Sequence, residues 1–198
     1  MSKPESEKKS VSLKWIAVAV IAIFIISIAL YSLFAAPPAE SGLQDPENDV
    51  QLNIGTEFPG MIDVVSATLQ ASGDALNVTI HLKDPVSTLG AGERAQWNVT
   101  VILEDDTFVE VYTVWADLNS TRLSGFVAGV EGSNASACQV EFHGSTLTLR
   151  APVSELQSAA KAEWSILTAY EKYSGDELTV SAFDFAPDEG LHTTTLRA

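Results

Sequence analysis

An uninterrupted apolar run near the N-terminus limits what this chain can fold into more than any other feature. Residues 15–34 contain no charged side chain, and twelve of these twenty positions are Ile, Val, Leu or Phe. As a helix this run would span about 30 Å, the thickness of the hydrocarbon layer of a bilayer. Its apolar residues favour insertion by roughly 4 to 7 kcal/mol. The sequence therefore predicts a transmembrane helix over residues 15–34.

The flanks of the run predict its orientation. Residues 1–14 carry four lysines and two glutamates, a net charge of +2, whereas the whole 198-residue chain has a formal charge of -15. Basic flanks stay on the cytoplasmic side. We therefore predict a single-pass signal anchor that contacts the lipid bilayer in the cell membrane, with a cytoplasmic N-terminus and an extracytoplasmic domain. A cleaved signal peptide and a pilin-type leader are the alternatives; the bulky Leu33 and Phe34 disfavour cleavage by a signal peptidase.

The rest of the chain is predicted to form one domain. Residues 35–42 read AAPPAESG, a short linker, and residues 43–198 are sufficient for one hydrophobic core. The chain has one cysteine, Cys138, so no intrachain disulfide can form, and we expect a buried, inert thiol. The strong negative charge repels phosphate backbones, which excludes nucleic acid as a partner.

Alternation of apolar and polar residues predicts that this domain is all-β. Leu76, Val78, Ile80 and Leu82 alternate with polar residues, and the same period recurs in residues 97–103. Such a period is typical of strands with one buried and one solvated face, and places Leu76 and Trp97 in the core. About nine short strands joined by Gly- and Asp-containing turns predict a two-sheet antiparallel sandwich.

Four N-x-[ST] sequons are compatible with that topology. They lie at Asn77, Asn98, Asn119 and Asn134, on polar strand positions or in expected loops, and none lies in the basic tail. Their number and placement favour a glycosylated surface outside the cytoplasm.

No catalytic constellation is evident in the sequence. His81, His143 and His192 are present, but no nucleophile elbow, zinc-ligand spacing, P-loop or dinucleotide fingerprint accompanies them. We therefore predict that the chain is not an enzyme.

Two acidic clusters lie near the ends of the predicted domain. Asp45 and Asp49 fall in DPEND, Asp63 begins the following strand, and Asp184 and Asp188 fall in FDFAPDEG. Carboxylate oxygens are the ligands that Ca²⁺ prefers, and the first and last segments of a sandwich can meet. The alternative is ordinary turn chemistry, in which Asp, Pro and Gly are common.

Several segments resemble the DOMON and carbohydrate-binding module family 9-like sandwiches, over about residues 45–190. These segments are DPEND (45–49), IDVVSA (62–67), GDALNVTI (73–80), STLTL (145–149), PVSEL (152–156) and AFDFAPDEG (182–190). The resemblance implies a jelly-roll-like sandwich that binds sugars or, in another branch, haem. It also implies a structural Ca²⁺ held by Asp45, Asp49, Asp63 and Asp184.

Aromatic platforms for sugar binding are then expected at Tyr112, Trp115 and Trp164. The alternation of residues along the strands also favours the alternative that several of these rings are buried in the core. Haem is not expected, because Met61 is the only methionine of the domain and matches no axial ligand of the family. The predicted function is a glycosylated, membrane-anchored cell-surface recognition module that binds a glycan or an envelope polymer. The alternative is a structural or accessory subunit of a membrane-surface protein assembly, with no small-molecule ligand.

Overall fold

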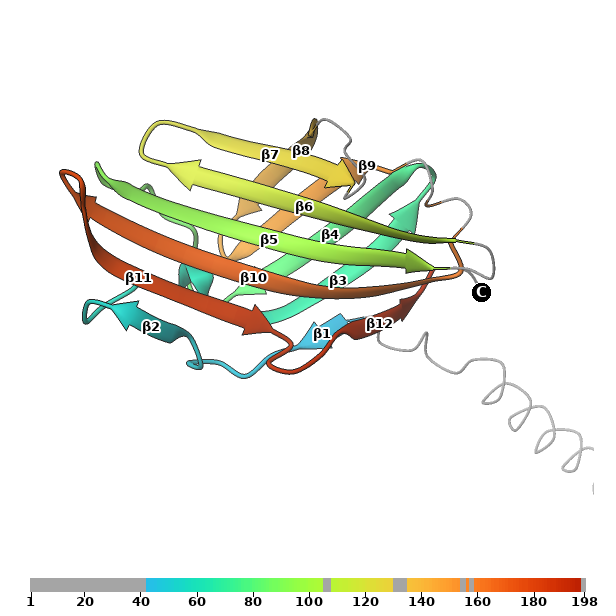
Figure 1. Ribbon diagram of the computed structural model, residues 1–198, viewed down its shortest axis with the longest axis horizontal. Coiled ribbons are helices and arrows are strands. Elements are labelled where there is room, and N and C mark those ends of the chain that lie inside the picture. The colour runs from blue at the N-terminus through green and yellow to red at the C-terminus, as the bar shows by residue number, and fades with distance from the viewer. Residues whose placement is uncertain (1–41, 105–107, 130–134, 154–155, 157–158, 197–198) are drawn as a thin grey trace, which may run out of the picture. The chain divides into compact units, whose positions relative to one another are not determined.

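A computed structural model describes residues 42–104, 108–129, 135–153, 156 and 159–196, all within one compact unit, Ser41–Ala198 (Figure 1). This part of the chain contains twelve strands and one three-residue 3-10 helix, η1 (Gly60–Ile62). The strands are β1 (Gly42–Gln44), β2 (Gln51–Ile54), β3 (Val64–Ser72), β4 (Ala75–Leu82), β5 (Glu93–Glu104), β6 (Val109–Asn119), β7 (Leu123–Gly129), β8 (Ser136–His143), β9 (Thr146–Pro152), β10 (Lys161–Ser174), β11 (Glu177–Ala186) and β12 (His192–Thr195).

All strand pairings in the described residues are antiparallel, and they join the strands into one sheet. The hydrogen-bonded order is β1-β3-β4-β9-β8-β7-β6-β5-β10-β11-β2, and β12 pairs with the beginning of β10. The sheet curls, so that β3, β4 and β9 lie behind β5, β6 and β10 in Figure 1. The predicted all-β antiparallel class is therefore confirmed.

The predicted division into two separate sheets is not confirmed. The two halves of the curled sheet are joined where β7 pairs with β8, through Gly125–Cys138, Phe126–Ala137 and Val127–Ser136. Twelve strands replace the nine expected, because β1, β2 and β12 are short strands in segments that lack a long alternating pattern.

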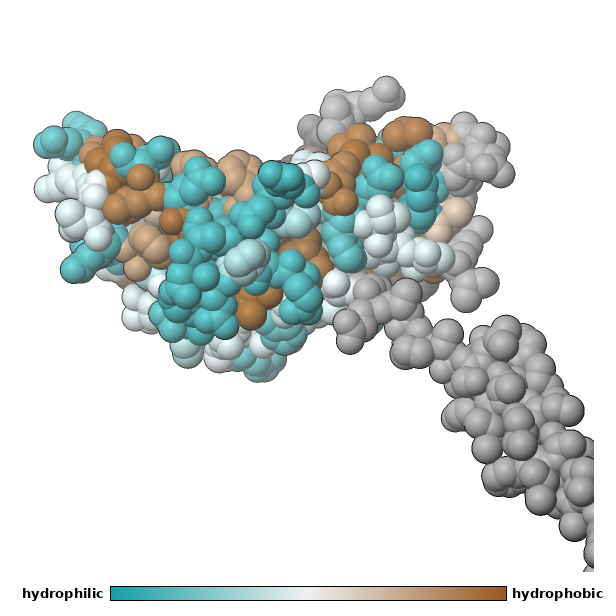
Figure 2. Space-filling model, turned by 90° about the horizontal axis from the view of Figure 1, so that it is seen from below, coloured by the Kyte–Doolittle hydropathy of each residue, from teal (hydrophilic) through white to brown (hydrophobic). Residues whose placement is uncertain are grey.

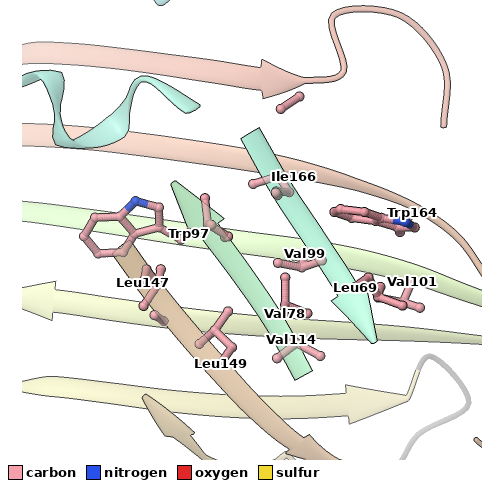
Figure 3. Close-up of a cluster of buried hydrophobic side chains, with 14 of the residues drawn as sticks. Leu69, Val78, Trp97, Val99, Val101, Val114, Leu147, Leu149, Trp164 and Ile166 are labelled. Carbon is pink, nitrogen blue, oxygen red and sulfur yellow. The ribbon is translucent and has the colours of Figure 1, made fainter. Parts of the chain in front are cut away.

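The core lies between the two halves of the sheet, and its side chains follow the alternation in the sequence. Leu76 and Trp97 are both 0% exposed, as predicted. Figure 3 shows Trp97, Val99 and Trp164 from the nearer half packed among residues of β3, β4 and β9. The indole Nε1 of Trp97 donates to the Met61 carbonyl oxygen at 3.1 Å, so its polar atom is satisfied in the core.

The half-buried Cys138 lies at the junction of β7 and β8. Burial raises the pKa of its thiol to about 11, so the thiol stays protonated at neutral pH. Because the thiolate is the reactive form, this agrees with an inert cysteine.

The membrane prediction requires a correction. The run at residues 15–34 lies outside the described residues, as do the tail (1–14), most of the linker (35–41) and Asn134. Among the residues that the structure does describe, no helix is long and apolar enough to cross a membrane. The predicted single-pass localisation in the cell membrane depended on such a helix, and this finding leaves it unsupported.

Candidate functional site: an acidic centre and a cleft

The topology explains why the two acidic clusters meet. β1 pairs with β3 at one edge of the sheet, and β2 pairs with β11 at the other. Residues 45–50, which connect β1 to β2, therefore pass from one edge of the curled sheet to the other. This connection carries Asp45 and Asp49 past Asp184 on β11. Figure 2 views the molecule from the side of β1, β2 and β12, where hydrophilic residues cover the middle of the surface.

Three carboxylates converge at this point. Asp45, Asp49 and Asp184 each present an oxygen, and these atoms all lie within 4.8 Å of one another. Asp45 is 8% exposed and Asp184 is 2% exposed. Asp184 Oδ2 accepts a hydrogen bond from the Val64 backbone N–H at 2.8 Å, whereas neither carboxylate oxygen of Asp45 has a hydrogen-bond partner among the described residues. A buried carboxylate without a donor is unfavourable unless a cation or a proton neutralises it.

The pKa values of the three carboxyl groups reflect the cost of burying negative charges side by side. Burial raises the pKa of Asp45 to about 7, and the negative charges of Asp184 and Asp49 add to the effect. Burial also raises the pKa of Asp184 to about 6, against the opposing hydrogen bond from Val64. The pKa of Asp49 is raised as well, by burial first. Each of the three carboxyl groups is therefore harder to ionise, because it is buried and the other two lie close to it.

The fourth predicted ligand, Asp63, has a different position. It is fully buried, but its Oδ2 accepts a hydrogen bond from the backbone N–H of Asn48 at 2.9 Å and lies 3.6 Å from Lys83 Nζ. Asn48 adopts a φ of 71°, a left-handed conformation that asparagine tolerates. Asp63 therefore holds the connection between β1 and β2 in place, and the structure does not group it with the three converging oxygens.

Asp188 is a further carboxylate near the three converging groups, and the predicted ligand set did not include it. Its negative charge contributes to the raised pKa of Asp45 and to the raised pKa of Asp49. It lies just beyond the end of β11, in the same FDFAPDEG segment as Asp184. Its presence in that acidic segment was the available signal, but the family motif directed attention to Asp184.

The donor set has a defined chemical preference. Three carboxylates offer only hard oxygen atoms, with no imidazole or thiolate among them. Ca²⁺ takes six to eight oxygens in irregular geometry, whereas Mg²⁺ requires a near-ideal octahedron. The residues present therefore fit Ca²⁺ better than they fit Mg²⁺ or Zn²⁺.

The predicted aromatic platform is only partly at the surface. Trp164 is 0% exposed and donates its Nε1 hydrogen to Thr194 Oγ1 at 2.9 Å, so it is a core residue and the ligand prediction is wrong for it. Tyr112 is paired with the buried Val101 and packs against the core. Trp115 alone of the three faces outward, with its ring centroid 5.4 Å from that of Phe126.

A cleft of about 480 Å³, within the usual range for ligand sites, was not predicted from the sequence. Glu93 in its wall accepts a hydrogen bond from the Gly90 N–H at 2.6 Å and lies 3.0 Å from Lys172 Nζ. Burial and a hydrogen bond to Glu93 raise the pKa of Tyr170 to about 12. Because Glu93 and Lys172 form an ion pair, their charges offset each other. Other lining residues include Glu57, Phe58, Ser87, Thr88 and Leu89.

The described sequons differ in accessibility. Asn119 is exposed, and its side-chain oxygen accepts hydrogen bonds from the Thr121 N–H at 3.0 Å and the Thr121 hydroxyl at 2.9 Å. Asn77 and Asn98 are half-buried on strands β4 and β5. Asn119 therefore offers the most accessible side chain of the three.

Comparisons with protein-family models and with curated proteins find no match. No protein-family model matches the chain, and no curated protein is significantly similar to it. The resemblance to DOMON and family 9-like modules stays a prediction, and the candidate sites depend on the geometry described above.

Proposed function

We propose that this chain is a non-catalytic recognition module whose folded state depends on one bound Ca²⁺. One observation carries the proposal: the buried, unpartnered carboxylate of Asp45 lies beside those of Asp49 and Asp184, where the sheet edges meet. A cation there neutralises the mutual repulsion of the carboxylates. It also ties the β1–β2 connection to β11, and so fastens one edge of the curled sheet to the other.

We further propose that the ligand is a glycan or another uncharged polymer, bound in the cleft beside Glu93. The half-buried Phe58 supplies aromatic surface for a sugar ring, and the exposed Ser87 and Thr88 supply hydroxyl groups. Glu93 is paired with Lys172, and the cleft wall also carries the exposed Glu57, whose negative charge disfavours an anionic ligand. The net charge of the chain, -15, also disfavours an anionic ligand.

A glycan array probed with the full-length chain in the presence of Ca²⁺ tests this function. We expect binding to a subset of uncharged glycans, weakened at least several-fold by Phe58→Ala in the cleft. Leu191→Ala removes an exposed side chain outside the cleft and serves as the control. Absence of binding to every glycan contradicts the recognition function, whereas equal binding by Phe58→Ala contradicts only the cleft.

A second candidate function, an accessory subunit of a protein assembly, is favoured by strand β2. This strand lies at one edge of the sheet, and its Leu52 and Ile54 are 39% and 44% exposed. Exposed apolar side chains on an edge strand are a common site of pairing with another chain. This alternative predicts that Leu52→Glu removes the chain from a larger complex in native extracts without lowering its melting temperature.

A further inference from the structure

One transverse row of side chains crosses the outer face of strands β7, β6, β5, β10 and β11. Directly paired residues of antiparallel strands point to the same face of a sheet. The register pairs Phe126 with Trp115, Trp115 with Asn98, Asn98 with Leu167, and Leu167 with Phe185. The five strands lie side by side in the layer nearer to the viewer in Figure 1. The row is therefore apolar except for its middle member, Asn98.

This row lies at the surface of the described residues and not in their core. Its members alternate along their strands with buried residues, and they are half-buried or, for Phe185, 44% exposed. The rings of Trp115 and Phe126 pack with centroids 5.4 Å apart, so the apolar surface is continuous from β6 to β7.

The adjoining surface has the composition of a protein interface. Along one side of the row, the facing residues Thr113, Thr100 and Ser165 are small and uncharged. Charged side chains lie toward the strand ends, where they are already paired within the chain: Arg94 with Asp117 at 2.6 Å, and Lys161 with Glu104 at 2.9 Å. An apolar centre bordered by charged residues is characteristic of protein–protein contacts.

We infer that this face packs against the same face of a second copy of the chain, about a two-fold axis that runs along β5 at Asn98. The order Phe126, Trp115, Asn98, Leu167, Phe185 has an apolar residue at equal distances on both sides of Asn98. The rotation places Trp115 on Leu167 of the second copy and Phe126 on Phe185 of the second copy. A two-fold interface requires this self-complementarity.

The polar residue at the centre also suits a second copy. A carboxamide has both donors and an acceptor, so two facing Asn98 side chains can each donate to the other. Among the described residues of one chain, the hydrogen bond that Asn98 Nδ2 donates is a long one, 3.5 Å, to the Leu167 carbonyl oxygen. A single buried polar pair in an apolar contact fixes its register, as a central asparagine does in coiled coils.

The size of the face is sufficient for a dimer. With strands about 4.8 Å apart and a rise of about 3.4 Å per residue, five strands and the outward residues of β5 from Arg94 to Glu104 cover about 24 by 34 Å. That is roughly 800 Å² per copy, the size of a standard specific interface. Face-to-face packing of two sheets with nearly aligned strands is a common arrangement.

The charge of the chain gives this dimer a distinctive salt dependence. Two copies with a formal charge of -15 each repel one another, and salt screens that repulsion over a Debye length of about 10 Å at 0.1 M. Association should therefore strengthen as ionic strength rises. An uncharged glycan bound to this face would show no such dependence.

Sedimentation velocity of the full-length chain tests the inference. We expect a species of twice the 21.2 kDa chain mass that becomes more abundant with added salt. Phe185→Glu should weaken the dimer at least tenfold, whereas Leu191→Glu, at a residue that is 42% exposed outside the row, should not. The near-isosteric Asn98→Asp should also weaken it at least tenfold, because it brings two carboxylates together on the axis.

Cross-linking locates the axis independently. In a Cys138→Ser background, Asn98→Cys should form an intermolecular disulfide with itself under mild oxidation. Leu167→Cys should cross-link to Trp115→Cys of another chain but not to itself. A monomer at every salt concentration up to about 0.1 mM protein overturns the inference, because a specific dimer should be populated there. Association that neither Phe185→Glu nor Asn98→Asp weakens overturns it as well, since the contact would then lie elsewhere.

Discussion

Asp45 and Asp184 lie at opposite ends of the domain sequence, yet each has a carboxylate oxygen within 4.8 Å of the other. Asp45 follows β1 at one edge of the sheet, and Asp184 belongs to β11 near the other edge. Their proximity results from the connection at residues 45–50, which crosses between the edges. A cation at this point would connect the two edges of the curled sheet and so stabilise its closed form.

The first prediction concerns that closure. Addition of millimolar Ca²⁺ to the metal-free protein should raise its melting temperature, because a ligand of the folded state alone stabilises it by about 2.7 kcal/mol at 100 times its dissociation constant. Asp45→Asn removes one charge without changing the shape of the side chain, and should abolish most of the shift. Calorimetric melts with and without Ca²⁺ provide the measurement.

The matched control for that experiment is Asp74→Asn, at an exposed turn residue outside the centre. It should retain the full response to Ca²⁺. Superimposable melts of the unsubstituted protein with and without Ca²⁺ would show that no such site exists.

The second prediction concerns the core. Truncation of the fully buried Leu76 or Trp97 to alanine should lower the free energy of unfolding by about 2 to 5 kcal/mol, through lost transfer energy and a residual cavity. Trp97→Ala also leaves the Met61 carbonyl oxygen without its indole donor. Denaturant unfolding measures both effects, and a loss below about 1 kcal/mol would contradict the assignment of these side chains to the core.

These residues show how much of the fold can be predicted from the sequence. Alternation with period two identifies the long strands and places Leu76 and Trp97 inward, because burial of one sheet face imposes that pattern. The same parity places Trp164 in the core, and a search for aromatic platforms misassigned it. The pattern does not specify which strands pair. The pairing of β7 with β8, which joins the two halves into a single sheet, could therefore not be predicted.

The candidate site also has features that the sequence predicts and features that only the fold determines. The acidic composition of DPEND and FDFAPDEG is evident in the sequence, and the predicted proximity of Asp45, Asp49 and Asp184 is confirmed, whereas their role as metal ligands stays a prediction. The different position of Asp63 depends on the backbone N–H of Asn48 and the side chain of Lys83, which only the folded chain brings to it. The cleft beside Glu93 likewise combines residues from distant segments with no common motif.

The third prediction tests the junction of the two halves of the sheet at Gly125. A Cβ atom added there would lie 2.1 Å from Val140 Cγ2 and 2.7 Å from Cys138 Sγ, so Gly125→Ala must displace β8. We expect a loss of about 1 to 3 kcal/mol from overpacking, measured by denaturant unfolding. Val140→Ala removes the closer atom, so the double variant should be more stable than the sum of the two single effects predicts. Strictly additive effects would show that the two residues do not meet.

The last prediction concerns pH. The pKa values of Asp45 and Asp184 in the folded protein are about 7 and about 6, whereas an aspartate in an unfolded chain has a pKa of about 3.9. Between about pH 4 and pH 7 the folded state therefore binds more protons than the unfolded state, and stability falls as pH rises through this range. The metal-free protein should consequently melt at a higher temperature at about pH 5 than at about pH 8. Because protons and Ca²⁺ compete for the same carboxylates, the stabilisation by Ca²⁺ should be largest at the higher pH and small at the lower. Asp45→Asn should flatten the pH dependence of the metal-free melts, and Asp74→Asn should preserve it. A metal-free melting temperature that rises from pH 5 to pH 8 would contradict the raised pKa values, and with them the electrostatic basis of the proposed calcium site.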